Sequence, residues 1–210
     1  MQIKCFTVNP FYENTYLIWD KHGVAAVIDP GFYSKAEWNS FASFISDHQL
    51  ILSDVILTHA HLDHIFGCEE IYRNFGLRPR MHADEISLYH GANQVAAMYG
   101  LDHFEYPPAG DLLSNNEVLH VGQLQLKILY TPGHSPGGIS LYSEAAGLVF
   151  SGDALFEGSI GRTDLPGGNM EILRSSIRNQ LFTLPSETTV YSGHGGVTAI
   201  GQEILTNPFF

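Results

Sequence analysis

The densest group of possible metal ligands in the sequence is the run Thr58-His59-Ala60-His61-Leu62-Asp63-His64. It follows an apolar segment at 51–57 that has the composition of a buried strand. Imidazole nitrogen suits zinc and similar ions, and a carboxylate adds a harder oxygen ligand with negative charge. The pattern H-x-H-x-D-H can therefore supply ligands to two neighbouring metal ions.

Three further candidate ligands, His134, Asp153 and His194, lie at comparable places later in the chain. Each follows a segment that we expect to be a strand, and the functional loops of α/β proteins gather at strand ends. A glycine precedes each of the three, which lets the backbone turn sharply and approach a metal closely. We expect these side chains to complete the site that the run 58–64 begins.

Strands and helices alternate in the segments that must position these ligands. Apolar runs predict an opening antiparallel meander, and Ser34 is the expected N-cap of the first helix. The expected strands are 3–8, 15–19, 24–28, 51–57, 80–82, 117–121, 124–130, 139–143, 148–151 and 189–192. The expected helices are 34–48, 65–74, one opening at 83–85, 170–181 and 199–205. This order indicates a mixed α/β (α+β) class, with 91–108 as a loop with short helical pieces that could line or cover the site.

Length and charge restrict the function further. The chain has 210 residues, of which 44% are hydrophobic, which suits a single domain over 1–210. Its net charge of -12 disfavours a nucleic-acid partner, because such binding depends on Lys and Arg. The N-terminus lacks a signal-peptide pattern and no apolar stretch approaches ~20 residues, so we expect a cytoplasmic protein without a membrane partner. Cys5 and Cys68 are expected to be reduced thiols, and the oligomeric state stays open.

The remaining histidines are expected to be ordinary polar residues, with one exception. His82 ends a short expected strand near the proposed site and could support a ligand. The others are His22, His48, His90, His103 and His120. The aromatic and apolar side chains of the 91–108 region and its approach are expected to pack that segment rather than to face a substrate; they are Tyr89, Met98, Tyr99, Phe104 and Tyr106.

The motifs T-H-x-H-x-D-H, P-G-H-S, S-G-D and G-H-G, in this order, make the chain resemble the metallo-β-lactamase superfamily. The resemblance spans most of the chain and implies an αββα sandwich of two packed sheets with outer helices. It also implies roles for seven candidate ligands. His59, His61 and His134 would hold a first metal, Asp63, His64 and His194 a second, and Asp153 would bridge the two.

This ligand set implies a hydrolase in which hydroxide bound to both metals is the nucleophile. Coordination lowers the pKa of water from about 15.7 towards about 7. The first metal would polarise the scissile carbonyl, the second would steady the leaving group, and Asp153 would set the spacing of the ions. Asp63 and Asp153 are thus the candidate catalytic carboxylates. Zinc is the expected metal, and iron and manganese are alternatives.

Within the superfamily, Ser151–Phe156 followed by Gly161-Arg162-Thr163-Asp164 resembles the glyoxalase II (hydroxyacylglutathione hydrolase) branch. A small-molecule thioester is therefore the expected substrate, since a thiolate with a pKa of about 8.5 leaves without a dedicated general acid. Arg162 lies where that branch places a basic residue against glutathione, and the alternative is a structural pair with Asp164. Asp164 and Gly195 replace aromatic contacts of that branch, and its C-terminal helical domain has no counterpart, which argues against glutathione as the thiol carrier.

Other reactions share these motifs. Persulfide dioxygenases resemble the chain at the same G-R-T-D element, with one iron held by residues matching His59, His134 and Asp153. Lactone hydrolysis on the same fold and a non-catalytic metal scaffold are further alternatives. The complete second ligand set favours the hydrolase.

Overall fold

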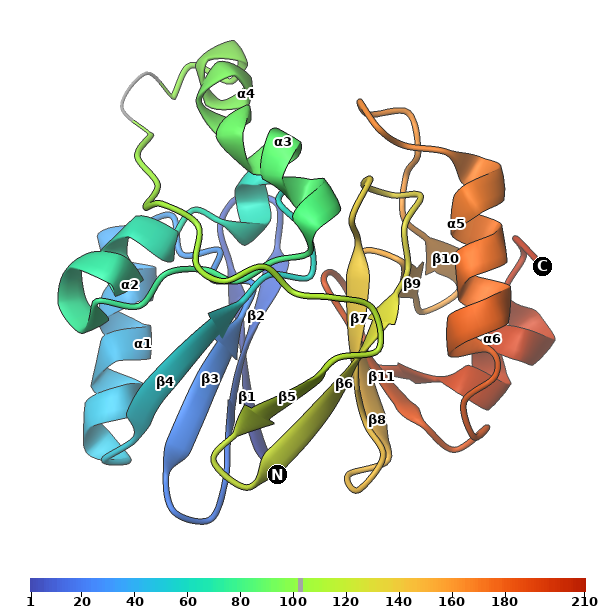
Figure 1. The fold of residues 1–210 in the computed structure, drawn as a ribbon, viewed down its shortest axis with the longest axis horizontal. Helices are drawn as coiled ribbons and strands as arrows, with labels where there is room; N and C mark the ends of the chain where they lie inside the picture. The colour runs from blue at the N-terminus through green and yellow to red at the C-terminus, as the bar shows by residue number, and fades with distance from the viewer. Residues whose placement is uncertain (102–103) are drawn as a thin grey trace.

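The computed structural model describes residues 1–101 and 104–210, so His103 lies outside the described residues. Its strands form two facing sheets with helices on both outer sides (Figure 1), which confirms the αββα sandwich. The first sheet has the order β1-β2-β3-β4, comprising β1 (Gln2–Val8), β2 (Glu13–Trp19), β3 (Val24–Ile28) and β4 (Ile51–Ile56). The first three strands are antiparallel, as the meander predicts, and β4 runs parallel to β3.

The second sheet has the order β12-β11-β8-β7-β6-β5. Its strands are β5 (Val118–Val121), β6 (Leu124–Tyr130), β7 (Ile139–Ser143), β8 (Leu148–Gly152), β11 (Thr189–Ser192) and β12 (Thr198–Ala199). Strands β8 and β11 pair in parallel, and the remaining pairs are antiparallel. A separate small hairpin of β9 (Leu155–Phe156) and β10 (Ser159–Ile160) follows β8.

The helices lie outside the sheets and above one end of them. Helix α1 (Lys35–Asp47) and α2 (Cys68–Phe75) flank the first sheet, and α5 (Met170–Ser176) and α6 (Ile200–Thr206) flank the second. The short α3 (Ile86–His90) and α4 (Ala92–Met98) lie at the upper end of the sandwich in Figure 1. No helix in the described part of the chain is long and apolar enough to span a membrane.

Strands with two buried faces divide the core into layers. Alternate residues of β2 and β3, among them Tyr16, Ile18 and Ile28, point between the sheets and meet Leu141 and Phe150 of the second sheet. The intervening residues face outward against the helices, because successive side chains of a strand point to opposite faces. This double burial explains why the strands appear in the sequence as nearly continuous apolar runs.

The outer side of the first sheet is covered by an aromatic cluster on α1. Helix α1 begins as predicted, at a capping box. The Ser34 hydroxyl accepts a hydrogen bond from the Glu37 amide, and the Glu37 carboxylate accepts one from the Ser34 amide. Phe41 is fully buried, and its ring lies 4.6 Å from that of Phe32 and 5.7 Å from that of Phe6. The helix is therefore fixed on the sheet whose strand β4 leads into the run 58–64.

Several expected elements differ in detail. The segment 80–82 makes single bridges from Arg80 to Ile56 and from His82 to Leu113 instead of a strand, since each residue pairs with a different partner. The segment 91–108 does contain a short helical piece as expected, namely α4, which packs through Ala92 and Ala96. The expected helix 170–181 changes to a π-helical turn at Ile177–Leu181. The two-residue strands β9, β10 and β12 are too short to leave a periodic signal.

Replacing Phe41 by alanine should lower the free energy of unfolding by about 3–5 kcal/mol, because the substitution leaves a cavity among aromatic rings that cannot collapse fully. Denaturant unfolding measures the change. Leu205→Ala, at a side chain that is 84% exposed on α6, is the control and should change stability by less than about 0.5 kcal/mol. Equal effects of the two substitutions would contradict the proposed packing of α1.

Candidate metal centre

The seven candidate ligands converge at one end of the sandwich from the ends of four strands. The run 58–64 follows β4, and its 3₁₀ turn Leu62–His64 brings Asp63 and His64 back toward the sheets. His134 follows β6, Asp153 follows β8 and His194 follows β11. Segments up to 135 residues apart in sequence, from His59 to His194, thus supply side chains to one small volume.

One group of potential ligand atoms belongs to His59, His61 and His134, and all lie within 4.8 Å of one another. His61 Nδ1 lies 2.8 Å from His134 Nε2. Two nitrogen lone pairs at this separation repel each other unless a proton or a cation lies beside both of them. The geometry suits a shared cation.

A second group consists of Asp63, His64 and His194, again within 4.8 Å. His194 Nε2 is 3.2 Å from Asp63 Oδ2, and His64 Nε2 is 3.8 Å from the same oxygen. Asp153 lies between the two groups, because its Oδ2 is 3.5 Å from both His134 Nε2 and His194 Nε2. Its Oδ1 is 3.4 Å from His64 Nε2. The carboxylate thus has the position of a bridging ligand.

Unpartnered buried atoms in the cluster test whether metal ions fit. The structure gives no hydrogen-bond partner to the buried Nε2 atoms of His59, His61 and His64 or to Oδ1 of Asp153. Leaving such groups unsatisfied costs about 1–3 kcal/mol each. Metal coordination would satisfy the nitrogens of His59 and His64 and the Asp153 oxygen, so the donor set fits a site for His/Asp-ligated ions.

Hydrogen bonds on the far side of the rings orient two of the histidines. His134 Nδ1 is 2.7 Å from the carbonyl oxygen of Arg162, and His194 Nδ1 is 3.0 Å from that of Phe11. In these two rings Nδ1 is therefore the donor, which leaves the Nε2 lone pair free for a metal. His64 Nδ1 lies 3.1 Å from Asp29 Oδ2, which is close enough for charge attraction but lacks hydrogen-bond geometry.

The electrostatics of the cluster favours neutral imidazoles in the first group. Burial lowers the pKa of His59 well below its ordinary value, and the neighbouring imidazoles lower it further. Burial and then His134 lower the pKa of His61 to about 3. These rings therefore keep lone pairs available at neutral pH.

The second group has the opposite balance. Burial disfavours the charged form of His64, but Asp153, Asp63 and Asp29 together raise its pKa well above the ordinary value. Burial likewise opposes ionisation of Asp153, yet His64, His134 and His194 hold its pKa below the usual range. A proton on His64 thus supplies positive charge that a bound cation would otherwise provide to the carboxylates.

A buried carboxylate, Asp29, fixes the start of the run 58–64. Its Oδ1 accepts from the Thr58 amide at 2.7 Å, and its Oδ2 accepts from the Thr58 hydroxyl at 2.6 Å. Asp29 also lies within reach of His59 and His64, but these bonds place its oxygens behind the rings, on the Nδ1 side of His64. We assign it to ligand orientation.

Glu85 joins the two loops that carry the first ligand group. Its side chain is fully buried, with Oε2 accepting from the Ala60 amide at 2.8 Å and Oε1 accepting from the Gly137 amide at 2.5 Å. Ala60 lies between His59 and His61, and Gly137 lies three residues after His134. One carboxylate therefore sets the distance between these loops.

Two glycines allow the close approach of the loops. Gly152, directly before Asp153, has φ +50°, and a Cβ there would lie 2.3 Å from the Thr58 hydroxyl oxygen. A Cβ on Gly193 would lie 2.1 Å from Asp153 Oδ1 and 2.8 Å from His64 Cε1. Neither position accommodates a side chain without displacing the ligands.

An open pocket of about 490 Å³ lies over the candidate ligands. Its walls are mainly apolar and come from the loop at Phe11, from α3 and α4, from the β9–β10 hairpin and from residues 162–166. Arg162 lies in this wall, but its guanidinium donates two bonds of 2.7 Å to the carboxylate of Asp164. This is the pairing that the sequence left as the alternative to substrate binding.

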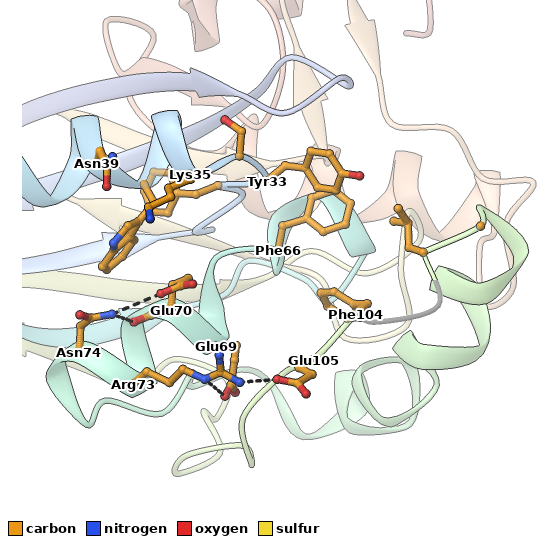
Figure 2. Close-up of a pocket in the computed structure, with 15 residues that line it drawn as sticks. Tyr33, Lys35, Asn39, Phe66, Glu69, Glu70, Arg73, Asn74, Phe104 and Glu105 are labelled. Carbon is orange, nitrogen blue, oxygen red and sulfur yellow. Dashed lines mark hydrogen bonds and ion pairs between the residues drawn. The ribbon is translucent and has the colours of Figure 1, made fainter.

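A larger cavity of about 700 Å³ lies apart from the ligands, between α1, α2 and the residues 100–101 and 104–105. Figure 2 shows its aromatic and acidic lining, in which Arg73 pairs with both Glu69 and Glu105. No group of three potential metal ligands gathers around it among the described residues. The chemistry therefore belongs to the smaller pocket.

Several supporting residues have no place in the sequence predictions. Asp29 and Glu85 hold the loops, and Phe11, Val95 and Phe156 form the pocket wall. Asp29 ends an expected strand just before Pro30-Gly31, which is the same strand-end signal that identified the ligands. The wall residues carry no such signal, because isolated apolar side chains are common in any core.

The other predicted residues have varied environments. His82 does not join the ligands; it caps the 3₁₀ turn Ala83–Glu85, and its ring lies 4.5 Å from that of Tyr130 at a tilt of 31°. Tyr89 is fully buried, as the packing prediction requires. Tyr99 instead lines the pocket, 61% exposed, with its ring 6.2 Å from that of Phe11.

Comparisons with known proteins agree with this geometry. A family model described as Metallo-beta-lactamase superfamily matches residues 8–194. The chain is 38% identical to the probable metallo-hydrolase YqgX of Bacillus subtilis, covering 100% of this chain and 97% of that protein. It is 36% identical to the hydroxyacylglutathione hydrolase GloC of Haemophilus influenzae, covering 100% of this chain and 98% of the relative.

Two solved structures are similar over the full chain. The BLEG-1 B3 metallo-beta-lactamase superposes with a TM-score of 0.90 at 36% identity, covering 99% of both chains. TTHA1623 in a di-iron-bound form superposes with a TM-score of 0.88 at 36% identity, covering 99% of this chain and 100% of that one.

Replacing Glu85 by alanine should weaken metal binding by at least about tenfold, because two buried amides lose their acceptor and the loops carrying His59, His61 and His134 lose their spacing. Metal content after dialysis, measured by elemental analysis, tests this. The matched control is Glu187→Ala, which removes an exposed carboxylate. Unchanged metal content in the Glu85 variant would contradict the positioning role.

Proposed function

This chain belongs to the metallo-β-lactamase superfamily, and we propose that within it the protein is a dinuclear metal-dependent hydrolase that cleaves small-molecule thioesters. Two observations together support this proposal. The two ligand groups share Asp153, and the pocket above them contains few groups that could protonate a leaving group. The identity with GloC supports the same substrate class.

The proposed ligands of the first ion are His59, His61 and His134, and those of the second are Asp63, His64 and His194. When bound, such ions polarise a carbonyl and lower the pKa of water toward neutrality. Asp153 would hold the two ion positions at a fixed separation. Iron, zinc and manganese all suit His/Asp donors, and the di-iron form of TTHA1623 makes iron as reasonable as zinc.

The chain's own residues orient the reaction. The bonds from His134 and His194 to main-chain carbonyls keep each ring fixed during turnover. Asp63 lies on the pocket floor beside His194. Its carboxylate can accept a hydrogen bond from a water molecule and so hold that water near the scissile carbonyl. The apolar walls above limit access of bulk water and strengthen these electrostatic interactions.

The nature of the leaving group favours a thioester over an amide or an ordinary ester. Apart from the proposed ligands, the described residues of the pocket wall include no carboxylic acid and no imidazole. Amine and alkoxide leaving groups need a proton, whereas a thiolate with a pKa of about 8.5 departs readily. Water adds to the acyl carbon, the C–S bond breaks, and the products are a thiol and a carboxylate with release of a proton.

Alternative reactions on this fold stay open to experiment. They are hydrolysis of lactones, hydrolysis of β-lactams, as the likeness to BLEG-1 suggests, and persulfide oxidation at a single iron bound by His59, His134 and Asp153. The expectations of a cytoplasmic location and of no nucleic-acid or membrane partner belong to the proposal. The charge of -12 supports the expectation about nucleic acid.

The protein, purified without added metal, should contain close to two transition-metal ions per chain and should hydrolyse thioesters in preference to lactones and β-lactams. Chelation should remove the activity, and metal addition should restore it, because the nucleophile depends on the ions. Elemental analysis and a three-class substrate panel measure both. Oxygen consumption with a persulfide substrate and one iron per chain would instead establish the oxygenase.

Asp153→Ala should reduce kcat/KM by more than about 100-fold while the protein stays folded, since the shared carboxylate is lost and the core is untouched. Kinetics, circular dichroism and metal content are compared with Asp47→Ala, which removes an exposed carboxylate at the end of α1. Retained turnover in the Asp153 variant would argue against a two-ion mechanism.

A further inference from the structure

We propose that the substrate is a thioester recognised through an apolar acyl group, and that a charged thiol carrier contributes nothing to its recognition. This inference rests on the proposed thioester hydrolysis and adds its substrate class. It follows from three features of the 490 Å³ pocket: its walls, the state of its single cation, and the charge of the surrounding protein.

The walls that rise from the candidate ligands are apolar on several sides. They include Phe11, Leu88, Val95, Phe156, Leu165 and Pro166, which come from four separate segments of the chain. Phe11 and Tyr99 meet edge to face at 6.2 Å and connect the N-terminal loop to the end of α4. An apolar group beside the scissile carbonyl would leave water for these surfaces, which is favourable in proportion to the area buried.

The one cation in the described pocket lining is Arg162, and Asp164 engages it. Nε donates to Asp164 Oδ1 and Nη2 donates to Oδ2, both at 2.7 Å, in the bidentate geometry typical of Arg with carboxylate. The pair lowers the pKa of Asp164 to about 2, so both groups are charged at neutral pH. A substrate carboxylate would compete with Asp164 for Nε and Nη2, and without displacing it could reach only the remaining N–H groups of the guanidinium.

The charge of the pocket floor depends on the ions as well as on Asp63 and Asp153. Two divalent ions would outweigh these two carboxylates, so the loaded floor itself does not repel an anion. Beyond the pocket, the chain carries 22 acidic against 10 basic residues, which repels anionic solutes at low ionic strength. Burial of the acyl group in the apolar walls is therefore the source of specificity that we propose.

Two series of thioesters test the proposal on the metal-loaded protein. In the first, the acyl group is lengthened from acetyl to butyryl on the neutral thiol N-acetylcysteamine, and kcat/KM should rise by up to about fourfold per methylene. In the second, the same butyryl group is carried by N-acetylcysteamine or by glutathione, and the anionic carrier should give no advantage.

Two variants locate the effect. Val95→Thr keeps the shape of the side chain but adds a hydroxyl, and it should reduce the gain per methylene without loss of metal. Asp164→Asn should free Arg162 and raise kcat/KM for the glutathione thioester relative to the neutral one by at least about threefold, with the gain lost at high salt. Asp47→Asn removes the same charge at an exposed position and should leave that ratio unchanged.

The outcomes separate the two proposals. If no thioester is turned over by the metal-loaded protein, the proposed function is wrong. If thioesters are turned over but kcat/KM is independent of acyl length, or is higher with glutathione than with N-acetylcysteamine, the thioesterase stands and recognition through an apolar acyl group is wrong.

Discussion

The metal centre depends on buried carboxylates that accept hydrogen bonds from the backbone of the ligand loops. Asp29 holds Thr58, and Glu85 holds Ala60 and Gly137. Burial makes unsatisfied amides costly, so each loop has one favourable position relative to the carboxylate that serves it. The sheets bring strand ends into the same region, but these bonds decide where the imidazoles lie. The sheets alone would bring the ligand loops only roughly together. The two carboxylates fix these loops, so that the ligand side chains have defined positions.

The charges of the ligand cluster suit bound cations. Neutral imidazoles of His59 and His61 lie on one side, and Asp63 and Asp153 supply negative charge on the other. Without a cation, His64 carries the positive charge that the carboxylates require. A site of this kind is costly to keep without ions, because its polar atoms face one another in a buried space. The same cost contributes to the affinity for metal.

The side chains of the pocket wall come from other segments than the ligands. Ligands come from the ends of the sandwich strands, whereas the wall comes from the N-terminal loop, α3 and α4, the β9–β10 hairpin and the loop at 162–166. Two wall residues, Phe11 and Arg162, also orient His194 and His134, but they do so through main-chain carbonyls, which side-chain substitutions leave in place. This separation explains how relatives with the same fold, such as GloC and the BLEG-1 lactamase, carry different names for their reactions. It also explains why Arg162 and Asp164 have to be considered as a pair.

The sequence by itself determined the fold class, most strands and helices and the seven candidate ligands, because local periodicity and a dense His/Asp pattern are properties of neighbouring residues. It could not determine Glu85, since its partners lie 25 and 52 residues away and an acidic residue after His82 has no local signature. Nor could it distinguish a free Arg162 from one bound to Asp164, or show that Tyr99 lines the pocket while Tyr89 is buried. The surroundings of Glu85, Tyr89 and Tyr99 depend on which segments meet in space, and only the packing of the two sheets and their helices fixes that. The Arg162 pair depends on the conformation of its own loop, which the residue types alone do not specify.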